Sequence, residues 1–274
     1  MKSKVTLLIV CLVSIFKASA QNRDFGNMSY EEALSLSENQ AILSQKISKI
    51  KMVNAAEISS TELEEQIATA IYDFEKNFKT LKSNSKTTSL HIKTSLGKEQ
   101  LKWLQFKRAI ESPVVFVNQL LDISEELLLE CNNVSDAIRM EADRRHLISY
   151  SKKNSRKKMR NINLLEKQNV SIQKFCMYYA ASQILDKGDD KNDILNKYLY
   201  LYDNIDATIT ALENSELITE DVQETINEMK ILTAGLFKKK KELISAKIPL
   251  DKVMETTNEM VVLLDKVETA YSVF

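Results

Sequence analysis

Residues 38–47, Glu38-Asn-Gln-Ala-Ile-Leu-Ser-Gln-Lys-Ile47, return 128 positions later as Glu166-Lys-Gln-Asn-Val-Ser-Ile-Gln-Lys-Phe175. Both segments read Glu-x-Gln-x-(Ile/Val)-x-x-Gln-Lys before a large apolar residue. A repeat of this kind indicates that each copy belongs to one structural unit. We therefore expect a duplicated fold, and we call the two segments the first and second motif copies.

The amino-acid composition predicts that both units are helical. Only 4 Gly and 2 Pro occur in 274 residues, and no Asn-Gly or Asp-Gly pair separates alternating apolar runs. Strand hairpins depend on such turn residues. Apolar side chains instead recur three or four residues apart, as they do on one face of a helix. The predicted fold class is all-α, with two tandem antiparallel four-helix bundles.

Turn residues set the limits of the two bundles. The first copy is predicted over residues 29–135 and the second over residues 161–274. Pro113 and Pro249 are the only prolines, and each is expected to open the last helix of its copy, because the first helical turn does not need the missing N–H. Residues 136–160 lack proline and glycine. They are predicted to form a basic helical connector, with one long continuous helix joining the bundles as an alternative.

Capping residues and the spacing of apolar residues predict where individual helices lie. The residues expected to cap helix starts are Ser29, Ser60 or Thr61, and Thr219. The third helix is expected over roughly residues 89–110, and the apolar side chains assigned to it are Leu96, Leu101, Trp103 and Leu104.

The first twenty residues are predicted to be a secretory signal peptide. Lys2 and Lys4 give a positive start, residues 5–16 are apolar, and Ala18-Ser19-Ala20 forms a cleavage site before Gln21. No later apolar run reaches the ~20 residues that span a bilayer. The mature chain is therefore expected to be soluble and either periplasmic or secreted.

Charge and cysteine content exclude several classes of protein. Without the three lysines of the leader, 35 basic and 38 acidic residues remain, a formal charge of −3. This balance argues against a nucleic-acid partner. Cys131 and Cys176 are too few for a disulfide framework. Two unpaired buried thiols are the favoured interpretation, and one bridge between them is the alternative.

The sequence does not group residues that could carry catalysis. His91 and His146 are the only histidines, and neither has a second metal ligand at helical spacing. There is no glycine-rich phosphate loop or nucleophile elbow. Adjacent acids such as Glu64-Glu65 diverge on a helix and are interpreted as solvated. The sequence therefore predicts no enzyme activity, no metal and no cofactor.

Nine basic residues lie between Arg139 and Arg160, against only Glu141 and Asp143. Such a run would suit an anionic lipid surface or an acidic protein. A solvated connecting helix explains the same residues without a partner, and this second interpretation is favoured.

The repeated motif remains as the candidate site. Gln40 falls between Leu36 and Leu43 on an apolar seam, where a polar side chain costs stability unless it is hydrogen-bonded. In one interpretation the glutamines pair across helices and fix their register. In the other they bind a small polar or anionic ligand. The candidate ligand-binding residues are Gln40, Ser44, Gln45, Lys46, Gln168, Gln173 and Lys174.

The first motif copy resembles the N-terminal sensory domain of PilJ-type chemotaxis transducers and NarX-type nitrate sensors. That family's first helix carries a pattern close to Ala-Gly-Arg-Gln-Arg-Met-Leu-Ser-Gln-Arg-Met. Four positions are identical: Gln40, Leu43, Ser44 and Gln45. In the second copy Gln168 and Gln173 are identical and Lys174 is conservative, whereas Ser171 and Ile172 differ. The resemblance extends over both copies, closely for about a dozen residues and loosely elsewhere.

This resemblance implies a periplasmic four-helix bundle that senses a small molecule at a dimer interface. In the nitrate-sensing members an arginine of the motif binds the anion. The two arginines before the Met position are replaced by Asn39 and Ala41 here, and by Lys167 and Asn169 in the second copy. Neither Ala nor Asn offers the planar fork that binds an oxyanion. Nitrate is therefore not expected to be the ligand.

The leading hypothesis is an exported, solitary sensor-type bundle of a Gram-negative bacterium, with no transmembrane or output module. It would bind a small polar ligand, an envelope or signalling partner, or both. In a sharper form, the two copies pack as an intramolecular pseudo-dimer that brings both motif helices together; a homodimer is also open. The alternative hypothesis is a purely structural helical scaffold of the cell envelope.

Overall fold

The computed structural model describes residues 25–272 except 57, 59, 146, 148–152, 186–187, 216–217, 238–239 and 246. Its regular elements in this range are helices, apart from one isolated bridge between Phe25 and Met28. The fold is therefore all-α, as the composition predicted. The predicted signal peptide lies outside the described residues.

Four long helices make up the first half of the chain. They are α2 (Tyr30–Ala55), α3 (Thr61–Asn84), α4 (Leu90–Glu111) and α5 (Val117–Arg144), with a short 3-10 turn, η2 (Ser85–Thr87), between α3 and α4. Helix α2 packs against α3 and α5, and α4 packs against α5. Phe74 of α3 stacks on Trp103 of α4, with ring centroids 4.0 Å apart. These contacts close a ring of four helices.

The second half follows a similar order with one extra short helix. Its elements are α6 (Lys153–Ile184), α7 (Asp189–Glu213), α8 (Glu220–Phe237), α9 (Lys240–Ile244) and α10 (Leu250–Ser272). Helix α6 packs against α7 and α10, and α8 packs against both α7 and α10. The long helices of this half thus also form a ring.

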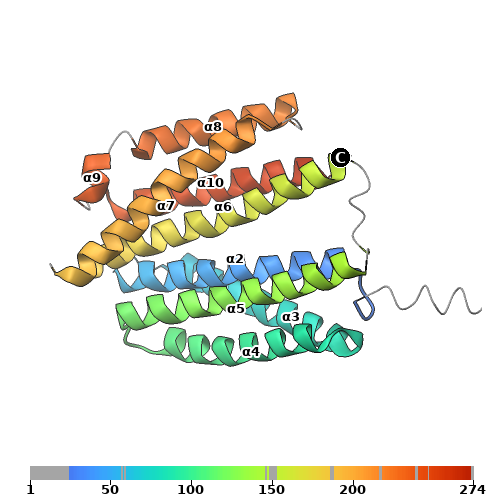
Figure 1. The fold of residues 1–274 in the computed structure, drawn as a ribbon. Coiled ribbons are helices and arrows are strands. Elements are labelled where there is room, and N and C mark those ends of the chain that lie inside the picture. Colours follow the sequence, from blue (N-terminus) through green and yellow to red (C-terminus); the bar gives the residue numbers. More distant parts are fainter. Residues whose placement is uncertain are drawn as a thin grey trace, which may run out of the picture.

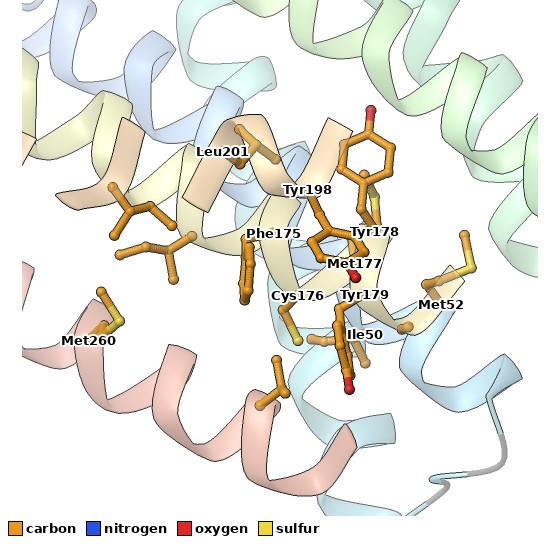
Figure 2. Close-up of a cluster of buried hydrophobic side chains, with 14 of the residues drawn as sticks. Ile50, Met52, Phe175, Cys176, Met177, Tyr178, Tyr179, Tyr198, Leu201 and Met260 are labelled. Carbon is orange, nitrogen blue, oxygen red and sulfur yellow. The ribbon is translucent and has the colours of Figure 1, made fainter. Parts of the chain in front are cut away.

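Helices α2 and α6, which carry the two motif copies, pack directly against each other at the centre of the molecule (Figure 1). One large apolar core continues from α2 across α6 to α7 and α10. Figure 2 shows part of it: Ile50 and Met52 of α2 lie near the run of α6 from Phe175 to Tyr179. The two halves therefore share a core.

Local capping explains where α2, α3, α4 and α8 begin. The Ser29 hydroxyl accepts from the N–H of Glu32, and the Glu32 carboxylate accepts from the N–H of Ser29. This reciprocal pair is a capping box, which satisfies two N–H groups at once. Ser60 and Thr219 cap α3 and α8 as predicted, and Ser89 caps α4. These starts follow from residues near the cap alone.

Two predictions about the end of the first half were wrong. Pro113 does not open α5, which begins at Val117, whereas Pro249 directly precedes α10. No continuous helix joins the halves, because α5 ends at Arg144. The N–H of Leu147 returns to the carbonyl of Ala142, and Leu147 packs on the apolar cluster beneath. A helix can end in this way without glycine when a hydrophobic contact accompanies the backbone bond.

The predicted connector also needs correction. Residues 136–144 belong to α5 and residues 153–160 to α6, so residues 136–160 do not form a separate helical connector. Of the four apolar residues that the sequence analysis named on α4, Leu101 and Leu104 are 64% and 46% exposed. The buried face instead runs through Leu96, Trp103, Phe106 and Ile110. Among the described residues, no helix is long and apolar enough to cross a membrane.

Candidate functional site

The two motif helices run parallel, and the glutamates that open the two motif copies meet. The carboxyl groups of Glu38 and Glu166, the first residues of the two motif copies, hydrogen-bond to each other. Toward the other end, Lys49 of α2 lies close enough to Cys176 of α6 to oppose the rise that burial causes in the pKa of its thiol. Figure 1 shows both helices running in the same direction. This is the close approach that the pseudo-dimer hypothesis requires.

The lysines of the two motif copies reach into the opposite half. Lys174 of α6 forms an ion pair with Glu125 of α5, at 2.7 Å between Nζ and Oε1. Its counterpart Lys46 on α2 is half-buried and lies near Asp265 of α10. Burial raises the pKa of Asp265, and the positive charge of Lys46 opposes that rise. Each motif lysine therefore faces an acid on the last helix of the other half.

A third pair of equivalent positions, Lys49 and Met177, also contacts the last helix of the opposite half. Lys49 donates to Asn258 of α10 at 2.7 Å, and Met177, 128 positions later, accepts from the hydroxyl of Ser124 on α5 at 4.0 Å. A twofold axis between two copies would generate contacts of this kind, in which one surface meets its own duplicate.

In the first copy, the glutamine and serine side chains are hydrogen-bonded inside the first half. The amide of Gln45 donates to the hydroxyl of Ser124 at 3.1 Å and to the hydroxyl of Ser44 at 3.3 Å. Ser48 also bonds Ser124, at 2.7 Å between the two hydroxyl oxygens. All four side chains are fully buried. Gln45 and Ser48 therefore hold α2 against α5, and the buried Gln45 and Ser44 are not open to a ligand.

The other three glutamines are also buried but less well satisfied. Both polar atoms of the Gln40 amide lack a hydrogen-bond partner. Gln168 donates to the carbonyl of Ile205 on α7 at 3.2 Å. Gln173 donates to Asn169 on its own helix, and its carbonyl oxygen has no partner. The structure therefore does not gather the predicted glutamines into one pocket.

A polar cleft of about 470 Å³ lies instead where α2, α5 and α6 meet. We call it the α2–α6 cleft. Only Lys174 of the predicted site residues lines it, together with the two motif glutamates. The full lining is Glu38, Ala41, Ile42, Asn132, Ser135, Asp136, Arg139, Asn163, Glu166, Lys167, Val170, Ser171, Lys174 and Leu201.

The electrostatics of this cleft centre on the paired carboxyls. Burial raises the pKa of Glu38 and, more strongly, that of Glu166, which the neighbouring carboxylate raises further. Two carboxyls in contact favour sharing one proton, since like charges at this distance repel strongly. Arg139 contacts Glu38 at 2.5 Å between Nη2 and Oε1 and opposes the rise. The pair is therefore held as one acid and one carboxylate beside a guanidinium.

Two buried polar atoms of the cleft residues have no hydrogen-bond partner. They are Nε of Arg139, a donor, and Oδ1 of Asn163, an acceptor. Buried polar groups nearly always have a partner, so this donor and this acceptor, on two residues that line one cleft, can still take a hydrogen-bonding partner there. This observation distinguishes the cleft from the closed Gln45 network.

Lys49 and Glu99 are buried charged residues that the sequence did not predict. Lys49 is only 3% exposed, and burial lowers its pKa to about 8. Glu99 is fully buried on α4, and burial raises its pKa to about 8, with Cys131 donating to it at 3.4 Å. Glu99 lies between Leu96 and Trp103 at helical spacing, so its inward position could have been predicted. The sequence around Lys49 does not indicate that it is buried, because the helices that cover it, α6 and α10, lie far along the chain.

The described residues contain no group of three or more His, Cys, Asp or Glu that could hold a metal ion. His91 is exposed on α4, and His146 lies outside the described residues. Cys131 and Cys176 are both free and buried, as the favoured interpretation predicted.

Comparison with known proteins found no matching family model, no matching curated protein and no matching solved structure.

Proposed function

We propose that this protein is an exported, non-enzymatic binding protein of the sensor type, which takes a small polar ligand in the α2–α6 cleft. The observation that carries the proposal is the unpaired Nε of Arg139 and Oδ1 of Asn163 beside the carboxyl pair. The resemblance of the motif to PilJ/NarX-type sensory domains supports the same class of function. The site, however, lies on the glutamates and Lys174 rather than on the glutamines.

The chemistry of the cleft restricts the ligand. Arg139 Nε needs an acceptor, whereas Asn163 Oδ1 and the carboxylate of the Glu38–Glu166 pair need donors. A small molecule that carries both, such as an amino acid or another zwitterion, satisfies all three. A simple anion such as nitrate would lie against the carboxylate without a donor to offer. The volume of the cleft falls within the roughly 300–1,000 Å³ of small-molecule sites.

The arrangement of equivalent residues supports an intramolecular pseudo-dimer. Glu38 and Glu166 meet across the contact between the halves, and Lys46 and Lys174 each cross to the other half. A ligand at this contact would touch both halves at once. Its binding would then change how tightly α2 and α6 are held together, and a signalling partner could detect that change.

The direct test is a thermal-shift titration of the protein with a panel of amino acids, amines and small carboxylic acids. Arg139→Lys keeps the positive charge but removes Nε, and Asn163→Ala removes the acceptor. We expect a zwitterionic compound to raise the melting temperature of the wild type. Each variant should weaken its binding by about tenfold, as for one lost hydrogen bond to a charged group. Asn196→Ala, on the exposed side of α7, is the matched control.

A panel without any stabilising compound, or variants that respond like the wild type, would contradict the proposed site. Export is tested separately, by measuring whether the mature chain begins at Gln21. A second candidate function, a structural scaffold, is favoured by the closed Gln45–Ser124–Ser48 network. It predicts that the motif glutamines contribute to stability alone.

A further inference from the structure

A long groove runs between α8 and α10, on a different part of the second half from the α2–α6 cleft. Its volume is about 1150 Å³, and Glu62 at the start of α3 borders it. Helix α10 lines it with a continuous stripe from Asp251 to Lys266, at intervals of three or four residues. Fifteen residues of helix rise by about 22 Å. The groove therefore has the length of a short helix and one complete helical wall.

Several apolar side chains line the groove, and two of them are exposed. Ile231 of α8 is 72% exposed and Val262 of α10 is 55% exposed. Leu232, Met254 and Leu263 lie beside them and are better buried. Isolated exposed apolar residues are common, but a group along two helices that line one groove is typical of a binding surface. The spacing on both helices suits a third helix packed between them.

The rim of the groove is acidic. It carries five carboxylates, Glu62, Glu228, Asp251, Glu255 and Glu259, against two lysines, Lys252 and Lys266. Within the described part of the chain, none of these seven side chains makes an ion pair. An uncompensated acidic rim around an apolar floor is complementary to a helix with one apolar face and basic flanks.

We propose that this groove docks a basic amphipathic helix of a partner protein. The partner helix would place its apolar face on Ile231, Met254 and Val262 and its lysines or arginines beside Glu228, Glu255 and Glu259. This inference is independent of the ligand proposed for the α2–α6 cleft, because the two sites share no residue. It assigns to the second half a role in protein recognition.

The test uses the full chain and a fluorescent helical peptide about 18 residues long, with leucines on one face and lysines on the other. Anisotropy titration should show binding at roughly micromolar concentration that weakens as salt is added. The double variant Glu255→Lys/Glu259→Lys, and separately Ile231→Asp, should each weaken binding at least tenfold. These side chains are exposed, so the variants are expected to fold, and circular dichroism checks that they do.

Three controls decide what the binding means. Asp206→Lys on α7 and Leu129→Asp on α5 make matched changes at exposed positions outside the groove and should leave the affinity unchanged. A peptide of the same composition in shuffled order, without an amphipathic face, should bind at least tenfold more weakly. Equal binding of both peptides, or no response to the groove variants, overturns the proposal. So does a homodimer that Ile231→Asp dissociates, because the occupant would then be a second copy of this chain.

Discussion

The two motif copies share a sequence pattern, yet their glutamines have different surroundings. In the first copy, on α2, Gln45 bonds Ser124 of the neighbouring helix α5. In the second copy, on α6, Gln173 reaches only Asn169 of its own helix. The glutamates and lysines behave alike in both copies and point across the contact between the halves. The comparison teaches that the amides belong to the interior of each half, whereas the charged residues connect the halves.

The difference arises from the neighbouring helices. Helix α5 presents Ser124 where Gln45 and Ser48 of α2 can reach it. On α6, the position equivalent to Lys49 is Met177. The sulfur of Met177 accepts from the hydroxyl of the same Ser124. One serine on α5 thus serves both halves. A motif that is repeated in the sequence is therefore not a site that is repeated in the structure.

The largest expected effect separates the two glutamines. Gln45→Leu should destabilise the protein by about 2–3 kcal/mol, because Ser124 and Ser44 lose a buried partner. Gln173→Leu should cost less than about 1 kcal/mol, since its one bond is local and its carbonyl oxygen is already unpaired. Urea denaturation measures both. Equal losses at the two positions would remove the distinction between the copies.

The next effect concerns the carboxyl pair and depends on pH. The folded-state pKa of Glu166 is raised, so the folded chain binds more protons than the unfolded chain above the ordinary carboxyl pKa. Stability should therefore fall as pH rises from about 4.5, and Glu99, with a pKa of about 8, adds to the fall. Glu166→Gln should reduce this slope and stabilise the protein at pH 8 by on the order of 1 kcal/mol.

Thermal melts of the wild type and of Glu166→Gln between pH 5 and pH 8 give this comparison. Glu65→Gln, at an exposed position of α3, is the control and should keep the slope of the wild type. A wild type whose stability rises with pH over this interval would show that the pair is fully ionised in the folded state. The electrostatic link between the motif copies would then be wrong.

The smallest expected effect is at Gln40. Its amide is buried without a partner, so Gln40→Leu removes an unsatisfied polar group at nearly constant volume. We expect a change between zero and about 1 kcal/mol of added stability. Chemical denaturation beside Gln45→Leu is the measurement. A loss of more than about 1 kcal/mol would indicate that Gln40 holds a buried water molecule.

Much of the fold followed from local sequence. The serine caps at Ser29 and Ser60 and the threonine at Thr219 were predicted correctly, because a cap depends on residues within one helical turn. The end of α5 was missed, since it depends on Leu147 packing on a distant cluster. On α4, Leu101 and Leu104 are exposed whereas Glu99 is buried, and residue type alone would predict the reverse.

The candidate site was predicted less well than the fold. The sequence identified the motif and its lysines, and Lys174 does line the cleft. It did not identify Arg139 or Asn163 as site residues, because the cleft that they line forms only when α5 and α6 both pack beside α2. The glutamines are polar residues on an apolar seam. Hydrogen bonding inside a bundle explains that position as well as ligand binding does.

The sequence alone determined the helical class, the starts of helices with a local cap and the presence of two related segments, since these depend on composition, on caps and on repetition. Only the tertiary structure decided which polar residues are buried and which share a cleft. Lys49 shows the reason most clearly: a lysine on a helix is expected in water, and its burial depends on two helices that follow more than a hundred residues later in the chain. Burial and charge pairing are properties of neighbours in space.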